Sequence, residues 1–137
     1  MQLREDVLRF LEEKRFAVLA TVNANGSPQQ TVMWYELRGD TIVMNTNRGR
    51  KKDRNLTRDP RASLCVEDEF RYVTLEGLIE FIEDPATAQA DIAALARRYH
   101  DADEAEKMAR EVFAPQERVT LLLHADRIDV HGFDGEE

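Results

Sequence analysis

The sequence has few of the features that mark specialised classes of protein. A single cysteine, Cys65, excludes an internal disulfide framework and is typical of a reducing compartment. Six glycines and four prolines in 137 residues are too few for a low-complexity or collagen-like chain. No apolar run approaches the roughly 18 residues that cross a membrane, and the charged N-terminal residues contain no apolar signal core. We therefore expect a globular, cytoplasmic protein with no membrane partner.

The motifs of many enzymatic sites are also missing. Neither Ser27 nor Ser63 lies in a Gly-x-Ser-x-Gly turn, and no glycine-rich nucleotide-binding loop occurs. The three histidines lack zinc-ligand spacing, so no metal site is expected. No pair of carboxylates stands out as a general acid and base. We therefore name no catalytic residue.

Charge is distributed unevenly along an acidic chain. The net charge of −8 repels DNA and anionic lipid as a whole, so no nucleic-acid partner is expected. Residues 48–61 are the exception, with seven basic and two acidic side chains and a local charge of +5. Such a spot suits a compact anion, and Gly49 before a helix start would add backbone N–H groups for phosphate. The alternative is a solvated helix whose like charges are tolerated in water. The residues alone leave both interpretations open.

Hydrophobic periodicity predicts a single mainly β domain of the α+β class over residues 1–137, with an N-terminal helix within 1–15 and a polar tail at 131–137. Helices are expected over 3–14, 85–99 and about 103–113, and 49–58 is compatible with a short one. Strands are expected over 16–22, 29–37, 41–46, 62–66, 71–82, 119–123 and 128–130. Short connections between them favour antiparallel neighbours. We expect a small, closed or nearly closed barrel of about seven strands with flanking helices.

Two further features concern the expected strands. Residues 28–35 form an aromatic and Met-rich segment with amides at its head, which could line a slot for a flat ring but is more often simply core. Gly77 lies on the apolar face of strand 71–82, where a missing side chain allows another group to approach closely.

Three stretches together resemble a known family. They read AVLATVNANGSPQQTVMWYEL, IVMNTNRGRKKDRNLTRDPRASLCVED and RYVTLEGLIEFIEDP, and extend with little interruption from Ala17 to about Pro85. The chain resembles the split β-barrel flavin and deazaflavin reductases, the superfamily typified by pyridoxamine 5′-phosphate oxidase. Within that superfamily it is most similar to the branch that uses coenzyme F420, a deazaflavin.

The resemblance implies a homodimer with two cofactor sites at its interface. The residues expected to hold the phosphate and tail of the cofactor are Asn45, Thr46, Arg50, Lys51, Lys52 and Asn55. Those expected to line the deazaflavin ring are Gln29, Gln30, Thr31 and Val32. Phe70 and Tyr72 would approach from the other subunit. In such proteins the cofactor carries the hydride while the protein binds, orients and excludes water, which agrees with the lack of a catalytic residue.

The resulting hypothesis is an F420-dependent oxidoreductase that transfers hydride between its cofactor and an unsaturated small molecule. One alternative is an FMN-binding oxidase or reductase of the same fold. Another is a non-catalytic cofactor carrier, or a domain whose basic segment docks an acidic partner. The strand pattern with Arg and Lys that is usual in flavin-type oxidases is not found, which favours F420 over FMN. Val32 stands where many relatives carry proline, which bears on the shape of the pocket wall.

Overall fold

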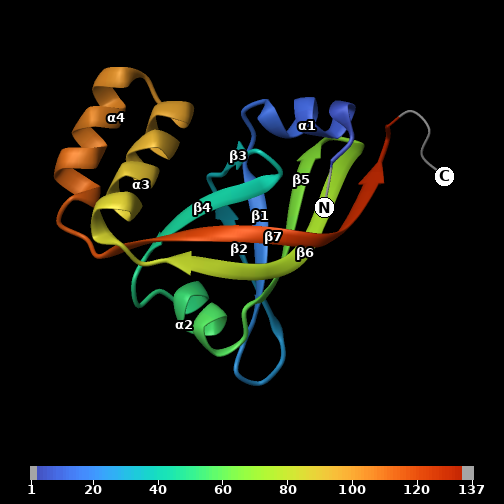
Figure 1. The fold of residues 1–137 in the computed structure, drawn as a ribbon, viewed down its shortest axis with the longest axis horizontal. Coiled ribbons are helices and arrows are strands. Elements are labelled where there is room, and N and C mark those ends of the chain that lie inside the picture. Colours follow the sequence, from blue (N-terminus) through green and yellow to red (C-terminus); the bar gives the residue numbers. More distant parts are fainter. Residues whose placement is uncertain (1–2, 134–137) are drawn as a thin grey trace.

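The structure, a computed structural model, describes residues 3–133 (Figure 1). The remaining residues, 1–2 and 134–137, include parts of the expected N-terminal segment and most of the expected polar tail, so these predictions lie partly outside the described residues. The helices are α1 (Glu5–Glu12), α2 (Lys51–Arg58), α3 (Pro85–Tyr99), α4 (Ala102–Met108) and the π-helical turn η1 (Ala109–Phe113). The strands are β1 (Ala17–Val22), β2 (Pro28–Met33), β3 (Glu36–Arg38), β4 (Thr41–Asn47), β5 (Arg61–Asp68), β6 (Arg71–Ile82) and β7 (Arg118–His131). The expected mainly β, α+β class is confirmed.

The strands form one antiparallel sheet in the order β2-β1-β5-β6-β7-β4-β3. Strands β2 and β3 follow each other in the chain yet occupy opposite edges of this sheet. Because only Trp34 and Tyr35 connect them, the sheet has to curl until its two edges meet. The covalent chain, rather than a ladder of hydrogen bonds, closes the barrel, which is the split β-barrel that the resemblance implied.

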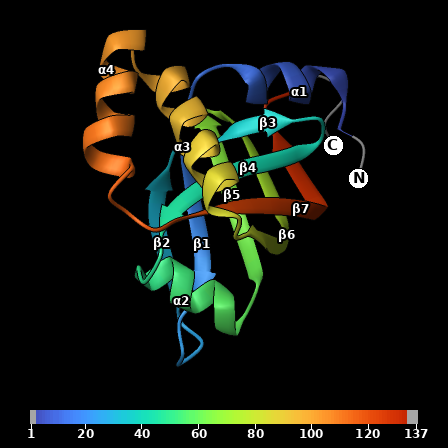
Figure 2. The same ribbon diagram turned by 60° about the vertical axis from the view of Figure 1, so that its left-hand side comes forward.

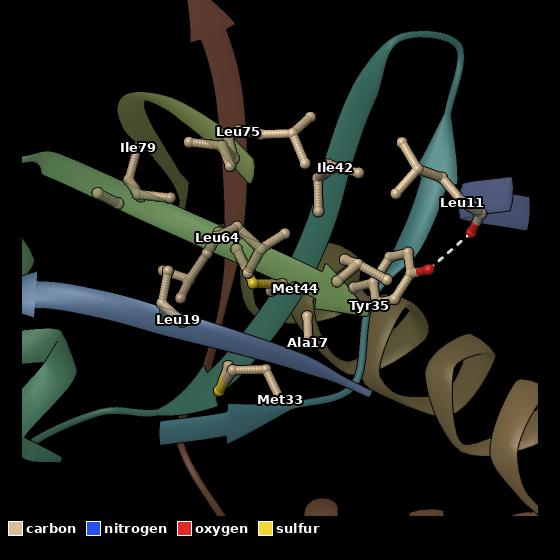
Figure 3. Close-up of a cluster of buried hydrophobic side chains, with 14 of the residues drawn as sticks. Leu11, Ala17, Leu19, Met33, Tyr35, Ile42, Met44, Leu64, Leu75 and Ile79 are labelled. Carbon is tan, nitrogen blue, oxygen red and sulfur yellow. Dashed lines mark hydrogen bonds between the residues drawn. The ribbon is translucent and has the colours of Figure 1, made fainter. Parts of the chain in front are cut away.

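The continuous strand expected over 29–37 is therefore wrong. The chain leaves one edge of the sheet after Met33 and joins the other at Glu36, and the side chain of Tyr35 lies buried between them. Its hydroxyl donates to the carbonyl oxygen of Leu11 at 2.8 Å, as Figure 3 shows. Trp and Tyr are strand-forming residues, so the sequence pattern contains no sign of the break.

The last two expected strands are instead the single strand β7. Its pairing with β6 shifts register where Glu76 faces Arg127 and Gly77 faces Ala125, so that Asp126 is an extra residue in a β-bulge. A Cβ atom on Gly77 would lie 2.0 Å from a backbone carbonyl oxygen across the ladder. The close approach predicted at Gly77 is confirmed.

The barrel interior contains the main hydrophobic core. Leu19, Met44, Leu64 and Leu75 point toward one another from four different strands (Figure 3). Helix α1 lies over one end of the barrel and α2 lies at the other end, while α3 and α4 pack together at the side (Figures 1 and 2). Between residues 3 and 133, no helix is long and apolar enough to cross a membrane.

Candidate functional site

The structure sorts the seven basic side chains of residues 48–61 into those that have partners and those that do not. Arg48 forms ion pairs with Asp53, at 2.7 Å, and with Glu83. Arg61 pairs with Asp59 at 2.7 Å, and this contact lowers the pKa of the Asp59 carboxyl to about 2. The charges of these two arginines are therefore compensated within the chain.

Two more arginines of the segment bind oxygen atoms at either end of α2. Arg54 donates from Nη1 to the carbonyl oxygen of Gly49 at 2.6 Å. Arg58 donates to the carbonyl oxygen of Val22 and, at 3.0 Å, to Oδ1 of Asn55. Both guanidinium groups are therefore bound to backbone or amide oxygens. Three cations of the segment remain.

The three remaining cations are Arg50, Lys51 and Lys52, and no other described side chain forms an ion pair or hydrogen bond with theirs. Arg50 and Lys51 are exposed at the start of α2, whereas Lys52 is only 8% exposed. A buried lysine without a carboxylate does not fit the solvated-helix interpretation. It fits an anion-binding site.

Lys52 lines a pocket of about 240 Å³ between the barrel and its helices. The polar residues around this pocket are Asn45, Thr46, Asn47, Arg50, Lys52 and Arg118. The apolar residues are Val32, Met33, Trp34, Ile92, Leu95 and Phe113. Strand β4 and the start of α2 supply most of the polar side, while the end of β2, helix α3 and η1 supply the apolar side.

Arg118 is a pocket residue that the sequence analysis missed. Its Nε donates to Oδ1 of Asn45 at 2.9 Å, and its Nη1 donates to Oε1 of Gln116 at 2.7 Å. The guanidinium carbon lies 5.0 Å from the ring centre of Phe113. No described group binds Nη2, which is left as a donor for a ligand. An isolated arginine at a strand start carries no sequence signal, because only the β4–β7 register places it beside the basic segment.

Arg50, Lys52 and Arg118 form what we call the cation cluster. Burial, followed by the charges of Arg50 and Arg118, lowers the pKa of Lys52. Burial and the charge of Arg50 lower the pKa of Arg118 to about 10. Both shifts show that the free protein disfavours this positive charge, and an anion in the pocket would relieve that cost.

Asn45 and Thr46, both expected to hold the cofactor tail, lie on the pocket wall, and Lys51 lies outside the lining. Both ends of the Asn45 amide already have protein partners: Nδ2 donates to the carbonyl oxygen of Ala88 at 2.9 Å, and Oδ1 accepts from Arg118. In this structure Asn45 holds the pocket together rather than presenting a free donor to it.

Asn55, the remaining residue expected at the tail, is not among the residues that line the pocket. Its Nδ2 donates to Oγ1 of Thr21 at 3.1 Å and to Oδ1 of Asn23 at 3.0 Å. The side chain is buried and connects α2 to β1 and the turn that follows it. Its role here is to fix the helix that carries Lys52.

The prediction that the N–H of Gly49 is open to phosphate is wrong. This group donates to Oδ2 of Asp53 at 2.8 Å, and Asp53 is buried. The carboxylate of Asp53 thus occupies the N–H group that an external anion would need at Gly49. An anion in this pocket would therefore meet the side chains of the cation cluster rather than this backbone group.

Strand pleating divides the four residues expected to line the ring. Val32 lines the pocket, and Gln30 shares its outward face on β2. Gln29 and Thr31 point the other way: Oε1 of Gln29 accepts from Thr21 at 2.8 Å, and the Thr31 hydroxyl is buried with no partner among the described residues. One chain therefore brings only Val32 of the four to the pocket.

Phe70 lies in the turn between β5 and β6, and Tyr72 is the second residue of β6. Neither side chain lines the pocket of its own chain. Their exposed fractions are 72% and 40%. The Tyr72 ring stacks on His131, with ring centres 5.0 Å apart. Both rings are accessible to another molecule.

Comparison with known proteins decides the family. A family model described as pyridoxamine 5′-phosphate oxidase matches residues 3–132. The chain belongs to this family. This family belongs to a flavin-binding superfamily of split barrels that includes oxidoreductases, and its structural neighbours also include heme-binding proteins. The resemblance seen in the sequence is confirmed at this level.

Solved structures agree with the family assignment. A conserved hypothetical protein from Mycobacterium tuberculosis is 28% identical, with a TM-score of 0.80, over 96% of this chain and 85% of that one. A protein described as an F420 reductase is 26% identical, with a TM-score of 0.74, over 93% of this chain and 98% of that one. The heme storage protein HutZ from Vibrio cholerae, 20% identical with a TM-score of 0.73 over the full length of both chains, shares the fold.

Proposed function

We propose that this protein is an oxidoreductase that binds coenzyme F420 and transfers hydride between it and an unsaturated small molecule. The observation that carries the proposal is the cation cluster of Arg50, Lys52 and Arg118 in a pocket that apolar and aromatic side chains also line. Three cations without a carboxylate among the described residues match a phosphodiester, and the apolar wall matches a flat ring. Similarity to a protein described as an F420 reductase supports this choice of cofactor.

Each pocket residue then has a binding or orienting role. Lys52 and the free Nη2 of Arg118 would hold phosphate oxygens inside the pocket, and Arg50 would do so from its exposed position. Lys51 lies next to them on the surface, where the carboxylates of a longer tail could meet it. The bound deazaflavin supplies the hydride chemistry, and Val32 and Trp34 would help to exclude water from its ring.

We also propose that two copies of the chain pair through the outer face of β2, β1, β5 and β6. This face exposes Val32 and Leu78, at 67% and 51%, and contains an open hollow of about 590 Å³. Burying such side chains between copies would stabilise a dimer. Phe70 and Tyr72 of a second copy would then be able to complete the ring site.

FMN is the second candidate, because the family as a whole binds flavins. FMN carries a single phosphate with no carboxylates, so it would use the cation cluster but not Lys51. Lys51→Met should therefore weaken F420 binding and leave FMN binding unchanged.

Thermal unfolding with F420, FMN or no ligand tests the proposal. A ligand at 100 times its Kd adds about 2.7 kcal/mol, which should raise Tm by several degrees at this chain length. Lys52→Met and Arg118→Met should each reduce that increase, and Lys107→Met, an exposed lysine on α4, serves as the matched control. Equal melting curves under all three conditions would rule out cofactor binding.

Turnover distinguishes an enzyme from a carrier. Reduced F420 is mixed with the protein and a panel of enones and tetrapyrroles, and reoxidation is followed by the return of deazaflavin absorbance. An oxidoreductase returns the absorbance with at least one acceptor. Tight cofactor binding without turnover on any member of the panel would favour the non-catalytic carrier.

A further inference from the structure

The guanidinium group of Arg118 needs to be held in place, because the charge of Arg50 repels it and its described partners, Asn45, Gln116 and the Phe113 ring, are all neutral. Arg50 contributes a like charge that lowers the pKa of Arg118, and no described carboxylate pairs with it. A long side chain in this situation would gain both entropy and solvation by turning outward. Its bond from Nε to Asn45 is one contact that prevents this.

A series of hydrogen bonds connects Asp91 on α3 to Arg118 through Thr120 and Asn45. The hydroxyl of Thr120 lies 2.7 Å from Oδ2 of Asp91. Nδ2 of Asn45 lies 3.3 Å from the same hydroxyl oxygen. Oδ1 of Asn45 then accepts from Nε of Arg118 at 2.9 Å. Thr120, Asn45 and Asp91 are all buried, so water does not compete freely for these bonds.

Asp91 determines which group donates and which accepts in each of these hydrogen bonds. An ionised carboxylate can only accept, so the Thr120 hydroxyl donates to Asp91 and its oxygen accepts from Asn45. The carbonyl oxygen of Ala88, also an acceptor, binds Nδ2 as well. The oxygen end of the Asn45 amide therefore faces Arg118. Were the Thr120 hydroxyl free to rotate, it could donate to Asn45 and favour the flipped amide, which would present a second donor to Nε.

The charge of Asp91 is compensated on the side away from the pocket. Arg38 donates from Nη2 to Oδ1 of Asp91 at 3.0 Å. A carboxylate placed directly beside Arg118 would hold the guanidinium but cancel the charge that the ligand needs. A carboxylate acting through two neutral side chains holds it without that loss.

We infer that Asp91 is a positioning residue that fixes Arg118 in the anion site through Thr120 and Asn45. Asp91 is not part of the pocket lining and would not contact the cofactor. The inference rests on the proposed function only in that Arg118 is taken to bind the ligand. The position of Arg118 itself can be measured without any ligand.

The test removes the Thr120 hydroxyl, which connects Asp91 to Asn45, and keeps a side chain of the same shape. Thr120→Val should weaken pyrophosphate binding about tenfold, measured through the fluorescence of Trp34, the single tryptophan, which lies in the pocket. In the ligand-free protein the same substitution should speed hydrogen exchange at Nε of Arg118, measured by NMR. Thr120→Ser, which keeps the hydroxyl, should preserve both properties. Thr41→Val, at the far end of β4, is the matched control.

A double-mutant comparison separates positioning from general damage. In an Arg118→Met background, Thr120→Val should cause no further loss of pyrophosphate affinity. Asp91→Ala provides a second break in the chain of bonds should Thr120→Val fail to fold. Equal losses in both backgrounds, or an unchanged exchange rate at Nε, would overturn the inference. Failure of the wild type to bind pyrophosphate, F420 or FMN would instead contradict the proposed function, while the exchange rate would still decide the role of Asp91.

Discussion

Lys52 and Arg48 belong to the same basic segment, yet their surroundings give them opposite roles. Arg48 has Asp53 and Glu83 as partners, and its charge helps to hold the start of α2. Lys52 is buried, and the charges that shift its pKa, those of Arg50 and Arg118, are also positive. A buried charge without a partner lowers the stability of the fold, so folding does not explain its presence, whereas the proposed ligand would.

Removing the charge of Lys52 should therefore weaken anion binding and raise the stability of the free protein. Lys52→Met keeps the length of the side chain and removes the ammonium group, and should stabilise the free protein by about 1 kcal/mol, which raises Tm by a few degrees. The same substitution should weaken sulfate and pyrophosphate binding. Lys51→Met, on the exposed neighbour, should leave Tm unchanged. A lower Tm for Lys52→Met would mean that Lys52 has a stabilising partner.

The lowered pKa of Lys52 also predicts how binding depends on pH. An anion favours the charged lysine, so the pKa of Lys52 is higher in the complex than in the free protein. The complex then holds more protons than the free protein between these two pKa values, and anion affinity falls as pH rises through that interval. The fall should begin on the alkaline side, below the ordinary lysine pKa of 10.5.

Sulfate is a suitable probe for this experiment because its charge does not change over the range. Trp34 fluorescence reports its binding at each pH. Lys52→Met should make this fall smaller, and the part that remains is due to Arg118, whose pKa of about 10 lies in the same alkaline range. An affinity that is independent of pH in the wild type would contradict the assignment of Lys52 to the site.

At the scale of elements, the bulge in β7 allows one strand to serve two parts of the molecule. Before the bulge, β7 pairs with both β4 and β6, and it carries Arg118, which lines the pocket, and Thr120, which bonds to Asn45. After the bulge it continues along β6 to His131. The bulge depends on Gly77, because a side chain there would collide with backbone atoms that cannot move independently of the strand.

Gly77→Ala should accordingly be far more harmful than an ordinary glycine substitution. The added Cβ would lie 2.0 Å from the carbonyl oxygen of His124, and we expect a loss of stability of about 3 kcal/mol or failure to fold. Gly26→Ala is the control: no atom lies within 4 Å of its Cβ position, and only its positive φ of 88° opposes the change, at about 1 kcal/mol. Denaturant unfolding measures both. Equal losses would mean that β7 can shift to accept a side chain.

At the scale of the whole molecule, the outer face of the sheet is more apolar than a solvated surface requires. Val32, Leu78 and Phe70 are each more than half exposed there or at its end. Val32 also lines the pocket, so this face and the anion site adjoin. A second copy on this face would cover the pocket from the side that the single chain leaves open.

Leu78→Lys should therefore shift the protein from a dimer to a monomer, because it places a charge in the proposed interface. Light scattering should give twice the chain mass of 15.8 kDa for the wild type and the single mass for the variant. Val112→Lys, at a similarly exposed valine on η1, should remain dimeric. A wild type with the mass of one chain would contradict the proposed dimer.

Local pattern determined most of the elements, but the boundaries of only some of them. Alternation along 71–82 and the helical spacing in 85–99 predicted β6 and α3 with the bounds that the structure shows, because each buries one face over its full length. The break at Trp34 and Tyr35 and the joining of the last two strands could not be predicted in this way. Both depend on which strand lies opposite, and a single strand does not contain that information.

The sequence by itself determined that positive charge is concentrated in residues 48–61, because a dense run of basic residues on an acidic chain is visible in the order of residues alone, and it left open whether that charge binds an anion or is solvated. Only the tertiary structure decided which of those charges are available. In the folded chain Arg48 and Arg61 pair with carboxylates, and the N–H of Gly49 donates to Asp53. Arg118, distant in the sequence, joins the remaining cations in the pocket. Charge composition is a property of the chain, whereas the pairing of charges depends on distances of a few ångströms that exist only once the barrel has closed.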